Sequence, residues 1–168
     1  MVAFLLTAPV LGASELSGIA GFAPVEDLVD QNSRFDFDHV RIVGARFETG
    51  FLMVLGFENN LVFGSNLLEV PDNPGSNGFY YTSNLVLNLP NGQFVPNLVF
   101  GVGFLHRSGD SFPDSGTSFL TNWGAGIKLR NLAGPFGVRF DYRRINVRDV
   151  LDQNLLMQEV SAGVLLSF

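Results

Sequence analysis

Cysteine is absent from the chain, which excludes disulfide bonds, thiolate metal sites and a cysteine nucleophile. Charge is scarce as well, because Asp, Glu, Lys and Arg supply only 15% of the 168 residues, whereas a typical soluble domain has about 25%. No stretch of the chain reaches the ~18 consecutive apolar residues of a membrane-spanning helix. Yet 46% of the residues are hydrophobic. The chain therefore has the composition of a membrane protein without the helices of one.

Cations are fewer than anions, with 10 Lys and Arg against 16 Asp and Glu and a net charge of −6. This balance leaves no basic surface for a nucleic acid. Lys128 is the only lysine, so there is no polybasic membrane anchor. No phosphate-binding loop, dinucleotide fingerprint or metalloprotease motif is present, so we expect no cofactor.

The 19 Gly and 17 Phe favour strands and turns over helices. Beyond residue 14, apolar residues recur at every second position, which is typical of strands with two different faces. The pattern is clearest in residues 136–143, where Phe136, Val138, Phe140 and Tyr142 alternate with Gly137, Arg139, Asp141 and Arg143. It predicts eight strands, separated by links at 25–36, 49–54, 65–78, 90–92, 106–117, 131–135 and 148–157.

The predicted links alternate between short turns and long loops, which is typical of an up-and-down barrel in the outer membrane. The sequence therefore predicts an all-β fold: an eight-stranded antiparallel up-and-down transmembrane β-barrel. We expect the apolar face of each strand to meet lipid and the polar face to line the narrow lumen. We also expect aromatic residues at both rims: Phe94, Phe136 and Phe168 at the short-turn end, and Tyr80, Tyr81, Phe119 and Tyr142 near the long loops. A soluble ligand-binding barrel, with these faces reversed, is the alternative fold.

Charged residues fall on the polar face of the later strands, where we expect a lumenal ion network. Its predicted members are Lys128, Arg130, Arg139, Asp141, Arg143 and Glu159. Charges in a narrow lumen must be paired, because an isolated buried charge is very costly. A carboxylate pair for acid–base chemistry, Asp141 with Glu159, is the alternative interpretation of the same residues.

The last strand carries a polar Ser161, then Gly163, then alternating hydrophobic residues that include Leu166 and end at the aromatic Phe168. This pattern resembles the C-terminal assembly signal of bacterial outer-membrane barrels. With eight alternating segments, residues 14–168 resemble the small OmpA/OmpX-like barrel family. The resemblance implies the outer membrane of a Gram-negative-type bacterium, surrounding lipid that includes lipopolysaccharide, and the barrel-assembly machinery as a partner. It also implies a non-enzymatic role in envelope integrity, adhesion or surface interaction.

The N-terminal segment 1–13 is apolar and ends in small residues, as in the signal peptide of an exported protein. We therefore expect a signal peptide or its remnant over 1–13 and the barrel domain over 14–168. A positively charged start is missing, since the first Lys or Arg is Arg34. A buried apolar segment is the alternative interpretation of these residues.

An enzymatic alternative rests on His106 and Ser108, whose spacing is similar to that of outer-membrane lipid A deacylases. The residues after Ser108 depart from that family, so we expect a polar loop start and no enzyme here. The long links are acidic, and Asp110 with Asp114 or Asp149 with Asp152 could bind a divalent cation. No EF-hand spacing is present, so we expect no metal site. The partner of the loops is left open.

Overall fold

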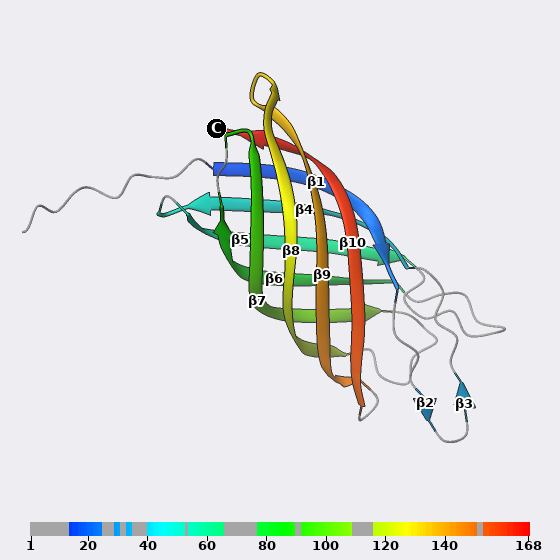
Figure 1. The fold of residues 1–168 in the computed structure, drawn as a ribbon. Helices are drawn as coiled ribbons and strands as arrows, with labels where there is room; N and C mark the ends of the chain where they lie inside the picture. The colour runs from blue at the N-terminus through cyan, green and yellow to red at the C-terminus, as the bar shows by residue number, and fades with distance from the viewer. Residues whose placement is uncertain are drawn as a thin grey trace, which may run out of the picture.

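The computed structural model describes residues 14–24, 29–30, 33–34, 40–52, 54–65, 77–89, 92–108, 116–150 and 153–168. Eight of its strands close into an antiparallel barrel (Figure 1), which confirms the predicted fold class. They are β1 (Ser14–Ala23), β4 (Val40–Gly50), β5 (Leu55–Ser65), β6 (Asn77–Asn88), β7 (Phe94–Ser108), β8 (Thr117–Ala133), β9 (Phe136–Val150) and β10 (Gln153–Ser167). Among the described residues, no helix has the length and hydropathy to cross a membrane. The predicted signal segment 1–13 lies outside the described residues.

Pairing of the first and last strands closes the barrel. β1 pairs with β10 from Glu15 opposite Ser167 to Phe22 opposite Val160, and its other edge pairs with β4. The backbones of Ser14 and Phe168 exchange two hydrogen bonds of 2.9 Å each. Every barrel strand therefore has a partner on both sides, so the described barrel has no open edge.

Several strands are longer than the hydropathy pattern predicted. β7 continues through Ser108 rather than ending near residue 105, and β10 begins at Gln153 rather than near residue 158. Backbone ladders extend irrespective of side-chain polarity, so strands can continue beyond the apolar stretch that reveals them. The region predicted as a 25–36 link also contains a two-stranded sheet, β2 (Val29–Asp30) with β3 (Ser33–Arg34), which the sequence did not predict.

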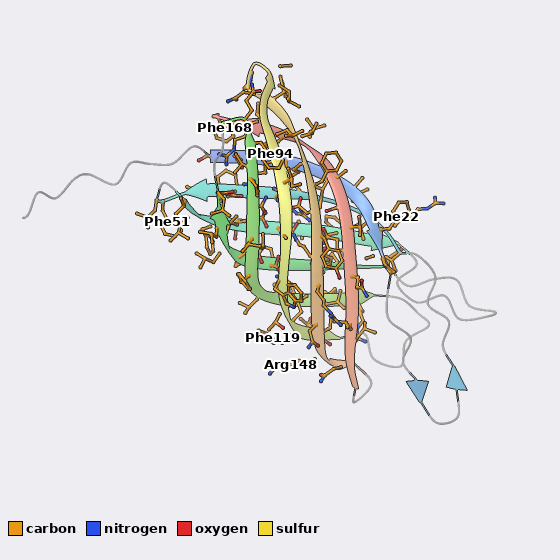
Figure 2. The ribbon with its side chains drawn as sticks, viewed as in Figure 1. Phe22, Phe51, Phe94, Phe119, Arg148 and Phe168 are labelled. Atoms are coloured by element: carbon orange, nitrogen blue, oxygen red, sulfur yellow. The ribbon has the colours of Figure 1, made fainter. Side chains whose placement is uncertain are left out.

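The two faces of the barrel wall differ sharply in polarity. Phe100, Phe140 and Val164 point outward, with 57%, 53% and 59% of their surface exposed. Lys128 and Arg139, on the opposite face of their strands, are 0% and 1% exposed. The side chains in Figure 2 project from the outer surface along the whole wall. The predicted orientation is therefore observed, and the reversed faces of a soluble barrel are not.

One rim residue was assigned to the wrong face. Tyr80 was expected among the outer aromatics near the long loops, but it points into the lumen and is 3% exposed. The reason is geometric: Tyr80 and Tyr81 are neighbours in β6, and successive strand residues face opposite sides. Tyr81 takes the outward position.

Glycines on the inner face make room for large lumenal side chains. A Cβ added at Gly101 would lie 1.9 Å from Asn84 Oδ1, and one at Gly126 would lie 2.6 Å from Asp141 Oδ1. At Gly103 the added atom would lie 1.8 Å from the Tyr81 carbonyl oxygen. The strands therefore approach closely at these points, and the neighbouring strand's backbone with the side chains of Asn84 and Asp141 occupies the space.

Candidate functional site in the barrel lumen

The six residues predicted for the lumenal ion network lie in two separate clusters. Arg139, Asp141 and Arg143 come from β9 and Glu159 comes from β10, near the middle of those strands. Lys128 and Arg130 come from β8 and lie toward the short-turn end. Each cluster is completed by residues from the first strands of the barrel.

The central cluster consists of Arg46, Glu58, Arg139, Asp141, Arg143 and Glu159, all almost fully buried. Arg139 Nη2 lies 3.0 Å from Glu58 Oε2, and Arg143 Nη1 lies 2.9 Å from Glu58 Oε1. Asp141 Oδ2 lies 2.7 Å from Arg139 Nε and 2.6 Å from Arg46 Nη1. Arg46 also forms an ion pair with Glu159. Three guanidinium groups thus neutralise three carboxylates.

The rim cluster consists of Glu15, Glu48, Lys128 and Arg130. Lys128 Nζ lies 2.8 Å from Glu15 Oε2 and 2.6 Å from Glu48 Oε2, and it donates to Asn88 Oδ1 at 3.0 Å. Arg130 forms an ion pair with Glu15. Two cations balance two carboxylates, so each cluster is neutral by itself. Balanced pairing limits the desolvation cost of bringing these groups into the lumen.

Four members of the two clusters were missed in the sequence. Glu15, Arg46, Glu48 and Glu58 lie on strands whose apolar alternation is weaker than that of the later strands. A signal was available nonetheless, because Arg46 and Glu48 flank the outward Phe47, and Glu58 follows the outward Phe57. The ion-pair partners of these residues could not be predicted from the sequence, since for example Arg139 and Glu58 are 81 residues apart.

An apolar layer fills the lumen toward the long loops. Its side chains come from all eight barrel strands: Ile19, Ala23, Val40, Ile42, Val62, Tyr80, Leu105, Leu120, Ile145, Val147, Leu155 and Met157. The Tyr80 hydroxyl donates to Glu159 of the central cluster, which joins the two layers. Each of these twelve side chains has at most 5% of its surface exposed. Ionic and apolar side chains therefore occupy successive levels of the lumen.

The contacts of Asp141 and Glu159 favour a structural role for these carboxylates over a role in acid–base catalysis. Both carboxylates bind guanidinium nitrogens of the same residue, Arg46, and both lie beneath the apolar layer. Glu159 also accepts a 2.7 Å hydrogen bond from Ser161 Oγ. Their acceptor positions are thus occupied by protein donors, which leaves little access for a substrate.

His106 lies on the outer face of β7, not in a loop as expected. Its Nδ1 is 3.1 Å from Thr117 Oγ1, and its ring centroid is 5.4 Å from that of Phe79. Arg107, between His106 and Ser108, is buried. Ser108 ends β7, but its side chain lies outside the described part of the chain. The His106 partner that the structure shows is a hydroxyl, not a carboxylate that would orient a general base.

The acidic links considered for cation binding fall almost wholly outside the described residues, including Asp110, Asp114 and Asp152. Asp149 belongs to β9, although its side chain is not described. Within the described ranges, no group of three or more His, Asp or Glu residues is arranged to hold a metal ion.

The four residues of the predicted assembly signal have different environments. Ser161 faces the lumen, where Arg46 Nη2 donates to its Oγ at 3.1 Å. Gly163 lies against β1, since a Cβ there would be 2.4 Å from the Gly18 carbonyl oxygen. Leu166 is half-buried opposite Leu16, and Phe168 is 66% exposed at the short-turn end (Figure 2).

Glu58→Ala tests the energetic role of the central cluster. The substitution removes one of the two carboxylates that Arg139 and Arg143 share and leaves Asp141 as the other, so we expect the free energy of unfolding to fall by about 3–5 kcal/mol. Urea unfolding of the refolded protein, followed by Trp123 fluorescence, measures the change. Arg148→Ala removes an exposed charge and should change stability by less than ~0.5 kcal/mol. Equal effects of the two substitutions would contradict the assigned role.

Comparison with known proteins finds relatives in structure alone. No family model and no curated protein sequence matches the chain. Neisserial surface protein A is similar in structure at 15% identity and a TM-score of 0.68, over 94% of this chain and 99% of that one. Ail, the attachment invasion locus protein of Yersinia pestis, is similar at 16% identity and a TM-score of 0.55, over 92% and 98%.

Both similarities extend over almost the whole length of each protein, so they concern the complete barrel and not a shared fragment. Identity near 15% establishes the common architecture, whereas activity must be argued from the residues of this chain. The chain has the fold of the small eight-stranded outer-membrane β-barrels, of the OmpA/OmpX-like type that its C-terminal strand and alternating segments predicted.

Proposed function

We propose that this protein is an integral outer-membrane barrel of a Gram-negative-type bacterium, with no enzymatic role. In this proposal it acts in envelope integrity or surface interaction through the long loops at one end. One observation carries it: exposed apolar side chains from all eight strands cover the outer wall, while the charged clusters face inward. Contiguous apolar patches beyond a few hundred Å² are rare on soluble monomers and mark contact with lipid or protein.

Aromatic residues at both ends of the wall support a bilayer position. Phe51, Phe94 and Phe168 lie at the short-turn end, and Phe22 and Phe119 lie toward the loops (Figure 2). All five have at least 42% of their surface exposed. Two such aromatic girdles flank the apolar band, about 25 Å tall, of a membrane barrel. The lipid around the protein would include lipopolysaccharide in the outer leaflet.

A sealed lumen is the second part of the proposal. The central and rim clusters and the apolar layer occupy the interior of a barrel whose eight strands leave little space beyond side chains. A role as a general porin is therefore not proposed. His106 bonded to Thr117 on the outer wall gives no support to lipid A deacylation, and the proposal includes no such activity.

Surface interaction is favoured by the position of the long connections. The strand ends that flank these connections lie at the barrel end opposite the short turns, and β2 and β3 lie on that side as well (Figure 1). The two structural neighbours are named as a surface protein and an attachment protein. By analogy we propose that these acidic loops contact a partner outside the cell.

Export and assembly complete the proposal. Residues 1–13 would direct the chain across the inner membrane and be removed. Residues 14–168 would form the barrel. The last strand, with Ser161, Gly163, Leu166 and Phe168, would be recognised by the barrel-assembly machinery. The exposure of Phe168 supports this role, because a side chain that packs against little of its own barrel is available to another protein.

Trp123 offers a direct test of membrane insertion. It is the single tryptophan, it lies on the outer face of β8, and it is 51% exposed. We expect lipids brominated along their acyl chains to quench its fluorescence when the refolded protein is added to vesicles. The same chain in urea, mixed with the same vesicles, should stay unquenched. An unquenched folded protein would rule out the membrane barrel.

Planar bilayers test the sealed lumen. The wild-type protein should form no large, stable channels, because two layers of side chains block the lumen. Lys128→Met breaks the rim cluster and leaves the apolar layer in place, so it should also fail to conduct. A general porin in the same apparatus provides the positive control. Reproducible porin-sized currents from the wild type would contradict the sealed lumen.

Phe168→Ala tests the assembly signal without removing backbone. The variant keeps both hydrogen bonds between residues 14 and 168, so refolding in vitro should be unaffected. In cells we expect less folded protein in the outer membrane and normal export to the periplasm, measured by fractionation and heat-modifiable gel mobility. Phe94→Ala removes another exposed aromatic at the same end and should insert normally. Equal insertion of both variants and wild type would count against a signal at Phe168.

A further inference from the structure

A polar group interrupts the apolar outer face of β5 and β6. Asn59, Tyr81 and Ser83 occupy outward positions on these paired strands, with Asn59 directly opposite Ser83. All three side chains are half-buried among apolar neighbours. We call them the wall triad.

The wall triad lies within the apolar band, away from its edges. Along β5 the outward neighbours of Asn59 are Phe57 on one side and Leu61 on the other, 45% and 37% exposed. Beyond Leu61 comes Phe63, and Leu85 follows Ser83 on β6. Within a bilayer this position has no water to satisfy polar groups. Polar residues inside the membrane are costly there and are often functional.

Hydrogen bonds within the triad satisfy its hydroxyl groups but not the amide nitrogen of Asn59. The Tyr81 hydroxyl donates to Asn59 Oδ1 at 2.6 Å, and Ser83 Oγ lies 3.3 Å from the same oxygen and 3.1 Å from Tyr81 Oη. Both hydroxyl hydrogens therefore have acceptors inside the triad. Among the described residues, Asn59 Nδ2 has no hydrogen-bond acceptor, and the hydroxyl oxygens retain lone pairs. Unused donors and unused acceptors thus lie side by side.

A surface that carries both unused donors and unused acceptors is complementary to itself. A two-fold axis through such a surface can place the donors of one copy opposite the acceptors of the other, and every contact then occurs twice. Acyl chains offer no hydrogen-bonding group at this depth and cannot satisfy the Asn59 amide. The surrounding Phe57, Leu61 and Leu85 would supply apolar contacts around the polar centre.

We propose that the β5–β6 wall forms a two-fold interface with a second copy of this chain in the membrane, centred on the wall triad. In this dimer Asn59 Nδ2 donates to a hydroxyl oxygen of the partner's triad, and the partner's amide does the same in return. The inference rests on the proposed membrane location.

Disulfide formation between single introduced cysteines tests the dimer, since the chain has no cysteine of its own. Leu61→Cys places a thiol beside the triad, and Phe140→Cys places one on β9, diametrically across the barrel. In phosphatidylcholine vesicles under mild oxidation, Leu61→Cys should form the covalent dimer at least about tenfold faster than Phe140→Cys, as expected for preferential pairing through hydrogen bonds in a membrane. Equal rates would overturn the proposal.

Asn59→Leu combined with Leu61→Cys tests whether cross-linking depends on the Asn59 side-chain amide. We expect cross-linking to slow to the rate of Phe140→Cys, with heat-modifiable mobility retained, because the substituted position is on the outer face. Asn146→Leu removes another outward amide, on β9, and should leave the Leu61→Cys rate unchanged. Undiminished cross-linking by Asn59→Leu would refute the role of the triad. If that variant failed to fold, the comparison of Leu61→Cys with Phe140→Cys would still decide the interface.

The two proposals fail in different ways in this experiment. Quenching of Trp123 by brominated lipid in the same vesicles reports insertion independently of pairing. Quenching together with equal cross-linking rates would overturn the dimer alone. Absence of quenching would overturn the membrane location and the dimer with it.

Discussion

Closure of the backbone hydrogen-bond ladder between β1 and β10 is the constraint on which the rest of the structure depends. An open sheet would leave two strand edges with unpaired N–H and C=O groups, which a bilayer cannot satisfy. Closure removes both edges and at the same time creates an inside and an outside. The two-residue alternation of each strand then assigns every side chain to the lumen or to the surroundings.

The enclosed interior of eight strands sets the second level of organisation. It is too narrow for bulk water, so charges that face inward must find partners from other strands. Arg46, Arg139 and Arg143 meet Glu58, Asp141 and Glu159, and glycines such as Gly126 leave space for them. Toward the loops, apolar side chains replace charges, and Tyr80 joins the two layers through Glu159.

The outer wall is apolar where the lumen is charged, with a polar exception on β5 and β6. Apolar side chains cover the wall from the Phe168 end to the Phe119 end, which suits hydrocarbon and not water. Asn59, with its amide among Phe57 and Leu61, departs from this pattern. The Tyr81 and Ser83 hydroxyls both lie within hydrogen-bond distance of Asn59 Oδ1, and this polar group on an apolar wall is the centre of the proposed two-fold interface.

By itself the sequence determined the fold class, because period-two alternation and alternating link lengths are local properties of the chain. Phe140 outward and Arg139 inward follow from that alternation alone. It also placed Lys128, Arg139 and Glu159 on the polar face, but it could not name their partners. Glu58 and Arg139 are 81 residues apart, and only barrel closure and strand register bring them together. Tertiary structure likewise decided that Asn59, Tyr81 and Ser83 meet on one wall, since strand pairing joins residues that the chain separates.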